Sequence, residues 1–144
     1  MVAWVPFDFF DHTGDIGVRV TAATATELFS EAARALTETL TDLSRVDARL
    51  ASTLALSSAE LDLLLVDWLN ELLFQFETGG LLVRRADVDL SSAQGQHRLA
   101  ARLEADRFDP ARHPIKVLVK AVTYHALEVV QVGKEWRATL VFDI

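Results

Sequence analysis

The sequence contains no cysteine among its 144 residues. This absence excludes disulfide bonds, zinc-thiolate sites, iron-sulfur clusters and cysteine nucleophiles. Hydrophobic residues still make up 51% of the chain, enough for one core that needs no cross-links. A protein of the reducing cytoplasm is the expectation that follows.

Basic residues are also scarce, because 14 Lys and Arg stand against 21 Asp and Glu and leave a net charge of -7. Such a chain lacks the broad positive surface that supplies most nucleic-acid affinity. No apolar run has membrane-spanning length, and Asp8 interrupts the apolar N-terminal residues, which carry no basic leader. We therefore expect proteins or ions as partners, no membrane and no export.

The first half of the sequence alternates between strand and helix patterns. Apolar residues at every second position predict a half-buried strand over residues 16–21. Capping boxes formed by Thr24 with Glu27 and by Ser57 with Glu60 predict the starts of two helices. The predicted helices cover residues 24–43 and 59–78, with a strand over residues 48–58 between them and Gly79 and Gly80 ending the second.

The second half of the sequence has strand patterns only. The predicted strands cover residues 81–90, 97–105, 117–122, 123–132 and 136–144, with turns at 91–96 and 133–135 and a loop at 109–116. This order indicates an α+β protein in which two helices pack on one face of a mostly antiparallel sheet. No spacer rich in Gly, Ser or Pro divides the chain, which predicts a single domain over residues 1–144.

Acidic residues lie at the start of the first predicted strand and at the end of the last one. Asp15 belongs to the stretch DHTGD, and Asp143 precedes Ile144, whose terminal carboxylate lies one residue away. If these strands are close in space, the three carboxylates form an oxygen cluster that suits magnesium or calcium. Two alternatives stay open: Asp143 is a solvated chain end, and Asp15 accepts backbone N-H groups in a tight turn.

Three other polar residues are candidates for the same site. His12 is either a proton shuttle or ligand, or a histidine that holds a turn by hydrogen bonds. The segment KAVTYH places Lys120 on one strand face and Thr123 and His125 on the other, unless a bulge intervenes. Lys120 could offset a carboxylate cluster or hold a phosphate, or it could be an edge lysine that prevents aggregation.

Five blocks of sequence, in order, carry a resemblance to a known family. The blocks are FFDHTGDIG at 9–17, LLVDWLNELLFQF at 64–76, FDPARHPIK at 108–116, KAVTYHALEV at 120–129 and VFDI at 141–144. In these blocks the chain resembles the archease family, protein cofactors of the GTP-dependent tRNA-splicing RNA ligase. The resemblance covers nearly the whole chain and implies a single archease-like domain over residues 1–144.

The resemblance implies roles for the candidate residues. Asp15 and Asp143 match aspartates that hold a divalent metal ion, with the terminal carboxylate of Ile144 as a further ligand and calcium, magnesium or manganese as the ion. Lys120 matches a lysine needed for activity, whereas His12, Thr123 and His125 match positions near that site. Gly14 departs from the family pattern, which commonly has alanine there.

The function that the resemblance implies is activation of a partner, not catalysis by this chain itself. Such a protein promotes guanylylation of the ligase histidine from GTP and multiple turnover in tRNA splicing or RNA repair, and it reaches RNA only through the ligase. The alternative is a free-standing metal-dependent phosphohydrolase or nuclease that uses Asp15, Asp143 and His12 or His125. A scaffold that needs none of these side chains is a third possibility.

Overall fold

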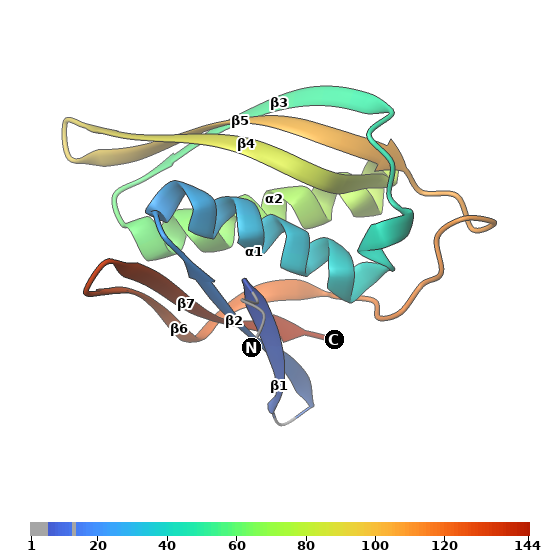
Figure 1. Ribbon diagram of the computed structural model, residues 1–144, viewed down its shortest axis with the longest axis horizontal. Coiled ribbons are helices and arrows are strands. Elements are labelled where there is room, and N and C mark those ends of the chain that lie inside the picture. Colours follow the sequence, from blue (N-terminus) through green and yellow to red (C-terminus); the bar gives the residue numbers. More distant parts are fainter. Residues whose placement is uncertain (1–5, 13) are drawn as a thin grey trace, which may run out of the picture.

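The computed structural model describes residues 6–12 and 14–144, without the side chain of His12. Two helices, a short 3-10 helix and seven strands make up this part (Figure 1). In chain order they are β1 (Phe7–His12), β2 (Asp15–Ala22), α1 (Ala25–Leu40), η1 (Leu43–Arg45), β3 (Leu50–Ser58), α2 (Leu61–Gly79), β4 (Leu81–Ala93), β5 (Gln96–Arg107), β6 (Ala121–Val132) and β7 (Glu135–Asp143).

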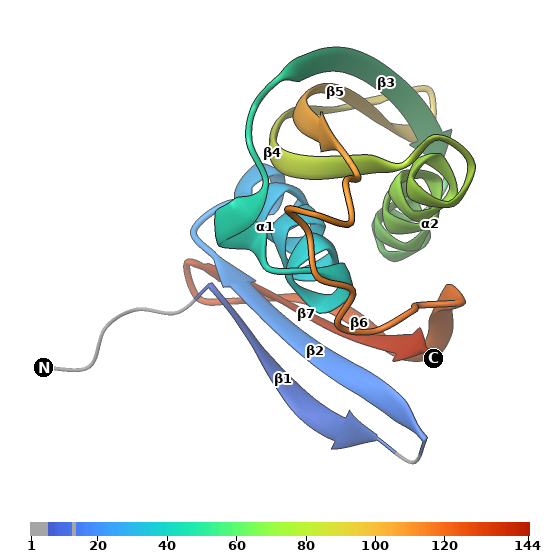
Figure 2. The same cartoon turned by 90° about the vertical axis from the view of Figure 1, so that its right-hand side faces the viewer.

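Both helices lie between two antiparallel sheets, one with the order β1-β2-β7-β6 and one with the order β3-β5-β4. Figures 1 and 2 show the three layers from two sides. The predicted α+β class with antiparallel strands and two helices is confirmed. The strands form two sheets where one was expected, because each helix contacts strands on two opposite sides.

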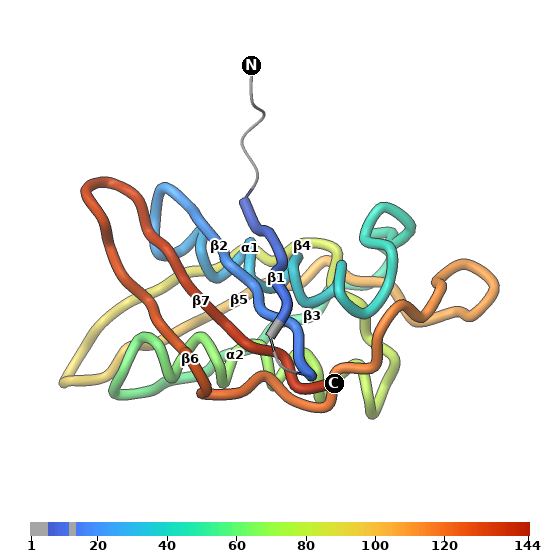
Figure 3. The backbone as a smooth tube through the Cα atoms, turned by 90° about the horizontal axis from the view of Figure 1, so that it is seen from below, coloured from blue at the N-terminus to red at the C-terminus, as the bar shows by residue number. Residues whose placement is uncertain are grey.

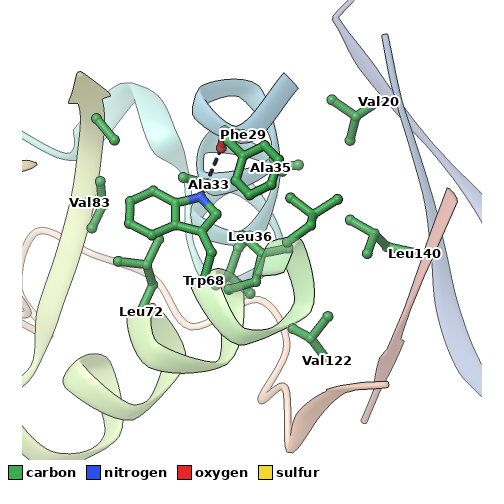
Figure 4. Close-up of a cluster of buried hydrophobic side chains, with 14 of the residues drawn as sticks. Val20, Phe29, Ala33, Ala35, Leu36, Trp68, Leu72, Val83, Val122 and Leu140 are labelled. Carbon is green, nitrogen blue, oxygen red and sulfur yellow. Dashed lines mark hydrogen bonds between the residues drawn. The ribbon is translucent and has the colours of Figure 1, made fainter. Parts of the chain in front are cut away.

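The indole of Trp68 on α2 lies at the centre of the core between the sheets. It is fully buried, and its Nε1 donates a hydrogen bond of 2.9 Å to the carbonyl oxygen of Phe29 on α1. Figure 4 shows Val83 of the three-stranded sheet on one side of this cluster and Leu140 of the other sheet on the opposite side. The Trp68 hydrogen bond therefore ties the two helices together where both sheets meet them.

The helix ends test the capping predictions. Thr24 caps α1, because its Oγ1 accepts from the backbone N-H of Glu27 at 3.1 Å, so the predicted helix start is confirmed. The carboxylate of Glu27 accepts from the N-H of Ala23 at 3.3 Å, one residue before the position that a capping box requires. The second box is wrong: Glu60 is the N-cap of α2 and makes no side-chain cap bond, since Ser57 still belongs to β3. At the other end Gly80 has a φ of 68° and closes α2 as predicted.

The strand β1 was not predicted. Its sequence FDFFDH has no alternation of apolar and polar residues, although it pairs with β2 along its whole length. The hairpin of β4 and β5 was predicted, but its strands run further and leave only a tight turn at Gln94 and Gly95, whose φ values are 56° and 74°. Within residues 6–12 and 14–144, no helix combines the length and the apolar character that crossing a membrane requires.

Replacement of Trp68 by alanine should lower the free energy of unfolding by about 3–5 kcal/mol, because it leaves a cavity and removes the partner of the Phe29 carbonyl. Urea unfolding followed by circular dichroism measures this change. Phe74→Ala on the same helix is the matched control, since this ring is 56% exposed and its loss should cost less than about 1 kcal/mol. Equal losses would contradict the central position of Trp68.

Candidate functional site

Asp15 and Asp143 lie directly opposite each other in the four-stranded sheet. Asp15 begins β2, Asp143 ends β7, and the two residues form the first of eight antiparallel pairs between these strands. Opposed residues in such a pair have Cβ atoms about 5 Å apart. Figure 3 shows the C-terminal end beside the start of β2. The condition that these strands lie close in space is therefore met.

The two aspartates occupy the face of this sheet that points away from the helices. Ile16 and Phe142, the next pair along, face the core, where Phe142 is fully buried. Because side chains alternate between the faces of a sheet, Asp15 and Asp143 point outward, and both are half-buried. The carboxylates are thus held by rigid strands and remain accessible from solvent.

An aromatic ring lies on the same outer face, beside Asp15 and Asp143, which together form the acidic pair. Phe10 pairs with Gly17, and its ring lies so close that a Cβ atom on Gly17 would collide with it. The guanidinium of Arg19 stacks over this ring, 4.3 Å from its centroid. Gly17 is therefore required for Phe10 to cover the sheet beside Asp15.

Lys120 is brought to the acidic pair by its backbone. Its N-H donates to the carbonyl oxygen of Asp143 at 2.7 Å, and its side chain is exposed. The prediction of a strand over residues 117–122 is wrong for its first part, since β6 begins only at Ala121. Lys120 thus sits at the entry to the sheet, where the bond to Asp143 fixes its position.

Asn70 of α2 fixes the next residues of β6 and was not predicted. Its Nδ2 donates to the carbonyl oxygen of Val122 at 2.9 Å, and its Oδ1 accepts from the N-H of Val122 at 2.9 Å. The side-chain amide of Asn70 thereby satisfies both backbone groups of Val122, as a neighbouring strand would. The sequence carries one signal, since Asn70 is a polar residue in the mostly apolar stretch LLVDWLNELLFQF. Its partner, Val122, is far away along the chain and is known only from the structure.

A bulge in β6 separates Thr123 from His125. The register with β7 shifts between Thr123 and Glu128, and Ala126 has a φ of 55°. The hydroxyl of Thr123 donates to the carbonyl oxygen of Val141 at 3.1 Å and accepts from the N-H of His125 at 3.3 Å. Thr123 therefore holds the bulge, and His125 is exposed within it.

The remaining candidates border the acidic pair through the backbone. His12 pairs with Asp15 across the hairpin of β1 and β2, while its side chain lies outside the described part of the structure. Ile144 follows Asp143 directly and is 39% exposed. The structure thus brings Asp15, Asp143, Ile144 and the backbone of Lys120 together, and it places His125 within the bulge of β6.

The donor set at this position suits a hard cation. Among the described residues, no three His, Cys, Asp or Glu side chains gather in a group that could hold a metal. Asp15 and Asp143 could supply two side-chain oxygens to a cation, with further oxygens from backbone carbonyls, a terminal carboxylate or water. An oxygen-only set of this kind fits calcium, magnesium or manganese and does not fit a soft metal.

A buried polar cluster anchors the loop that leads to Lys120. Asp106 accepts from two nitrogens of Arg112, at 2.9 and 3.2 Å, and also from the N-H of Asp47 at 3.1 Å. The hydrogen bonds from Arg112 lower the pKa of Asp106 far below its usual range, although burial opposes this shift. The carboxylate of Asp106 therefore stays ionised while almost completely buried.

His113, fully buried beside Asp106, is held in one tautomer. The N-H of Asp109 donates to its Nδ1 at 2.9 Å, so the ring hydrogen belongs on Nε2, which lies 3.2 Å from the carbonyl oxygen of Arg45. Lys116 adds a further anchor through its N-H, which donates to the carbonyl oxygen of Leu40 at 3.0 Å. The loop itself was expected from the sequence, whereas its anchoring residues were not.

A comparison with protein-family models matches residues 7–144 to the archease protein family (MTH1598/TM1083). The chain belongs to the archease family. The protein archease of Methanosarcina barkeri is 33% identical over 96% of this chain and 95% of its own length. The protein archease of Methanopyrus kandleri is 34% identical over 97% of this chain and its entire length.

Solved structures agree with this assignment. The solution structure of Methanobacterium thermoautotrophicum protein 1598 superposes with a TM-score of 0.83 at 28% identity, over 96% of this chain and 99% of that one. The crystal structure of an archease, possible chaperone, from Thermotoga maritima gives a TM-score of 0.60 at 18% identity, over 94% of both chains. The second likeness shows the fold alone.

Gly14 lies in the turn before Asp15 with a φ of 74°, and no atom lies within 4 Å of the place that an alanine Cβ would take. Gly14→Ala should therefore lower the free energy of unfolding by about 1 kcal/mol through backbone strain alone. Gly79→Ala in α2 is the control and should be neutral or stabilising by up to about 1 kcal/mol. Urea unfolding that shows no loss for Gly14→Ala would contradict a left-handed turn residue.

Arg112→Ala should lower the free energy of unfolding at pH 7 by about 3 kcal/mol, because it removes both guanidinium hydrogen bonds from the buried carboxylate of Asp106. The pKa of Asp106 is depressed in the folded state, so its contribution is present above about pH 4 and is lost as the pH falls further. The difference between variant and wild type should accordingly shrink below about pH 4. Unfolding titrations at several pH values measure it.

Arg102→Ala is the control for this experiment, since Arg102 is exposed and makes no ion pair within the described residues. Its loss should change stability by less than about 0.5 kcal/mol at every pH. A difference between Arg112→Ala and wild type that grows toward acid would contradict the assigned role of Asp106.

Proposed function

We propose that this chain is an accessory protein that binds a divalent cation at Asp15 and Asp143 and activates a GTP-dependent RNA ligase. The direct pairing of these two aspartates on an accessible sheet face is the observation that carries the proposal. Membership of the archease family supports it. An accessory role also agrees with the description of the Thermotoga maritima archease as a possible chaperone.

A bound cation would offset the repulsion within the acidic pair. Two carboxylates on residues paired at about 5 Å repel each other, and a positive charge between them removes that cost. We propose the α-carboxylate of Ile144 as a third ligand, with calcium, magnesium or manganese as the ion. When bound, such an ion supplies positive charge that polarises a phosphoryl oxygen.

Lys120 would act beside the acidic pair during guanylylation of the ligase. In that step a ring nitrogen of the ligase histidine attacks the α-phosphorus of GTP. A nitrogen-phosphorus bond forms, the bond to the bridging oxygen breaks, pyrophosphate leaves with the electron pair, and the histidine loses its proton to solvent. We propose that the exposed ammonium of Lys120, on a residue bonded to Asp143 through its backbone, offsets negative charge on the leaving pyrophosphate.

The overall charge of the chain fits a transient partner of the ligase. A net charge of -7 attracts the chain toward a basic RNA-binding cleft. The same charge opposes a long stay beside bound RNA. We propose that the chain leaves after activation and meets RNA only through the ligase.

The decisive measurement is the rate at which labelled GTP guanylylates the cognate ligase in the presence of manganese. Substoichiometric wild-type protein should accelerate labelling, and both Asp15→Ala and Lys120→Ala should reduce this acceleration at least 10-fold. Asp8→Ala is the matched control, because this exposed carboxylate of β1 pairs with Arg19 at 3.6 Å, away from the acidic pair. It should behave like wild type.

Thermal unfolding with added manganese, magnesium or calcium separates the two roles. The ion should raise the Tm of wild type and Lys120→Ala but not that of Asp15→Ala. Excess ion that restores both Tm and activation to Asp15→Ala would make the cation structural only. Activation that survives both substitutions would favour a scaffold, whereas GTP or RNA hydrolysis by the chain alone, lost in Asp15→Ala, would favour the metal-dependent hydrolase.

A further inference from the structure

The two sheets have four edges, formed by β1, β6, β4 and β3. A sheet edge carries backbone N-H and C=O groups that can pair with another strand, and proteins usually block such edges with charges, bulges or covering segments. Within residues 6–12 and 14–144 these devices occur on three of the four edges. β3 has none of them.

The edge formed by β4 is blocked by α1. The hydroxyl of Ser30 donates to the carbonyl oxygen of Ala86 at 2.9 Å, and that of Thr37 donates to the carbonyl oxygen of Val83 at 2.7 Å. A bulge interrupts the strand between Val83 and Arg85. Two carbonyl groups in the first half of β4 are therefore already occupied, and the second half carries the exposed carboxylates of Asp87 and Asp89.

The edges of the other sheet are blocked in different ways. On β6 the amide of Asn70 occupies both backbone groups of Val122, and the bulge after Thr123 breaks the regular edge. β1 is six residues long and carries the exposed carboxylates of Asp8 and Asp11. Neither edge offers a long, regular and uncharged strand.

β3 is open by every one of these criteria. Its nine residues, LASTLALSS, include no charge and no proline, and they pair with β5 without any shift of register. Figure 1 shows β3 along the outer border of its sheet. Alternate residues direct their backbone groups away from β5. On the helix side Leu54 and Leu56 are only half-buried, so the edge also exposes apolar surface.

We propose that β3 pairs antiparallel with β3 of a second copy of this chain, about a twofold axis at Leu54. This register places Thr53 opposite Ala55 and Ala51 opposite Ser57. All four side chains are small, exposed and uncharged, so no like charges meet. Leu54 meets its own copy on the helix side, where it gains burial. The two three-stranded sheets become one sheet of six strands.

A second copy fits this edge better than a charged segment. A charged strand paired with β3 would lie beside uncharged side chains only, so its charges would find no partner for an ion pair. About Leu54 the register also pairs Leu50 with Ser58 and Ser52 with Leu56, so no charge lies along the paired edge. Twofold pairing of identical edges closes into a dimer that cannot grow further. Nine paired residues form an interface at the small end of the usual range, which predicts a weak dimer with a Kd of about 1–100 μM.

The proposed dimer does not rest on the proposed function. Asp15 and Asp143 belong to the other sheet, beyond the helices from β3 (Figure 2). Both acidic pairs stay accessible when the β3 strands pair. Loss of the dimer and loss of ligase activation are thus separate outcomes.

Sedimentation velocity of the wild-type chain from about 1 μM to 1 mM tests the proposal. The expected result is a shift from one chain to two chains as concentration rises. Thr53→Lys with Ala55→Lys places a lysine opposite a lysine on both sides of the axis, and it should weaken the dimer at least 10-fold. Both positions are exposed, so thermal unfolding should show a folded variant.

Thr53→Lys with Ala55→Glu is the matched control, because each lysine then meets a glutamate of the other copy. It should restore the wild-type Kd or tighten it. A wild-type chain that stays monomeric up to about 1 mM overturns the proposal and leaves β3 to a strand of another protein. A dimer that the lysine pair does not weaken lies elsewhere, and a lysine-glutamate variant that fails to recover overturns the twofold register.

Discussion

Burial of both helices on two opposite sides is the constraint on which the rest of this structure depends. The buried residues of α2, Trp68 and its neighbours, form an apolar surface too wide for one sheet to cover, so a second sheet packs on the part that the first does not reach. The three layers follow from this requirement. They leave the outer faces and the edges of the sheets for polar groups and for contacts with other molecules.

The candidate site lies on the outer face of the four-stranded sheet, outside the hydrophobic core. Like charges on directly opposed strand residues repel each other, and packing of the core does not require these two residues. The backbone around these two residues is held by several hydrogen bonds. Asn70 holds Val122, Lys120 is bonded to Asp143, and Arg112 with Asp106 anchors the preceding loop. A rigid frame around an unfavourable pair of charges is what a preorganised ligand site needs.

Features set by neighbouring residues could be predicted from the sequence. The cap at Thr24, the stop at Gly80 and the hairpin after α2 depend on a few adjacent residues, and the structure has all three. The strand β1 was missed because it has no period of two, and the cap at Ser57 was wrong because β3 continues past that residue. The division into two sheets depends on contacts that no local pattern encodes.

The candidate site shows the same limit. Asp15 and Asp143 could be chosen by residue type and family resemblance, but only the register between β2 and β7 makes them neighbours. The face on which His125 lies depends on a bulge that the sequence KAVTYHALEV does not reveal. Asn70 and Asp106 were missed because their partners are far away along the chain.

The pairing of β2 with β7 also determines when the site can exist during synthesis. These strands lie near opposite ends of the chain, so the acidic pair is an extreme case of long-range contact. During synthesis on the ribosome, Asp15 is made before β7, and it can pair with Asp143 only after β7 has left the exit tunnel. A nascent chain that still lacks β7 therefore has no complete acidic pair, and the ability to take up a cation at these residues would mark a chain in which β2 and β7 have both been made and have paired.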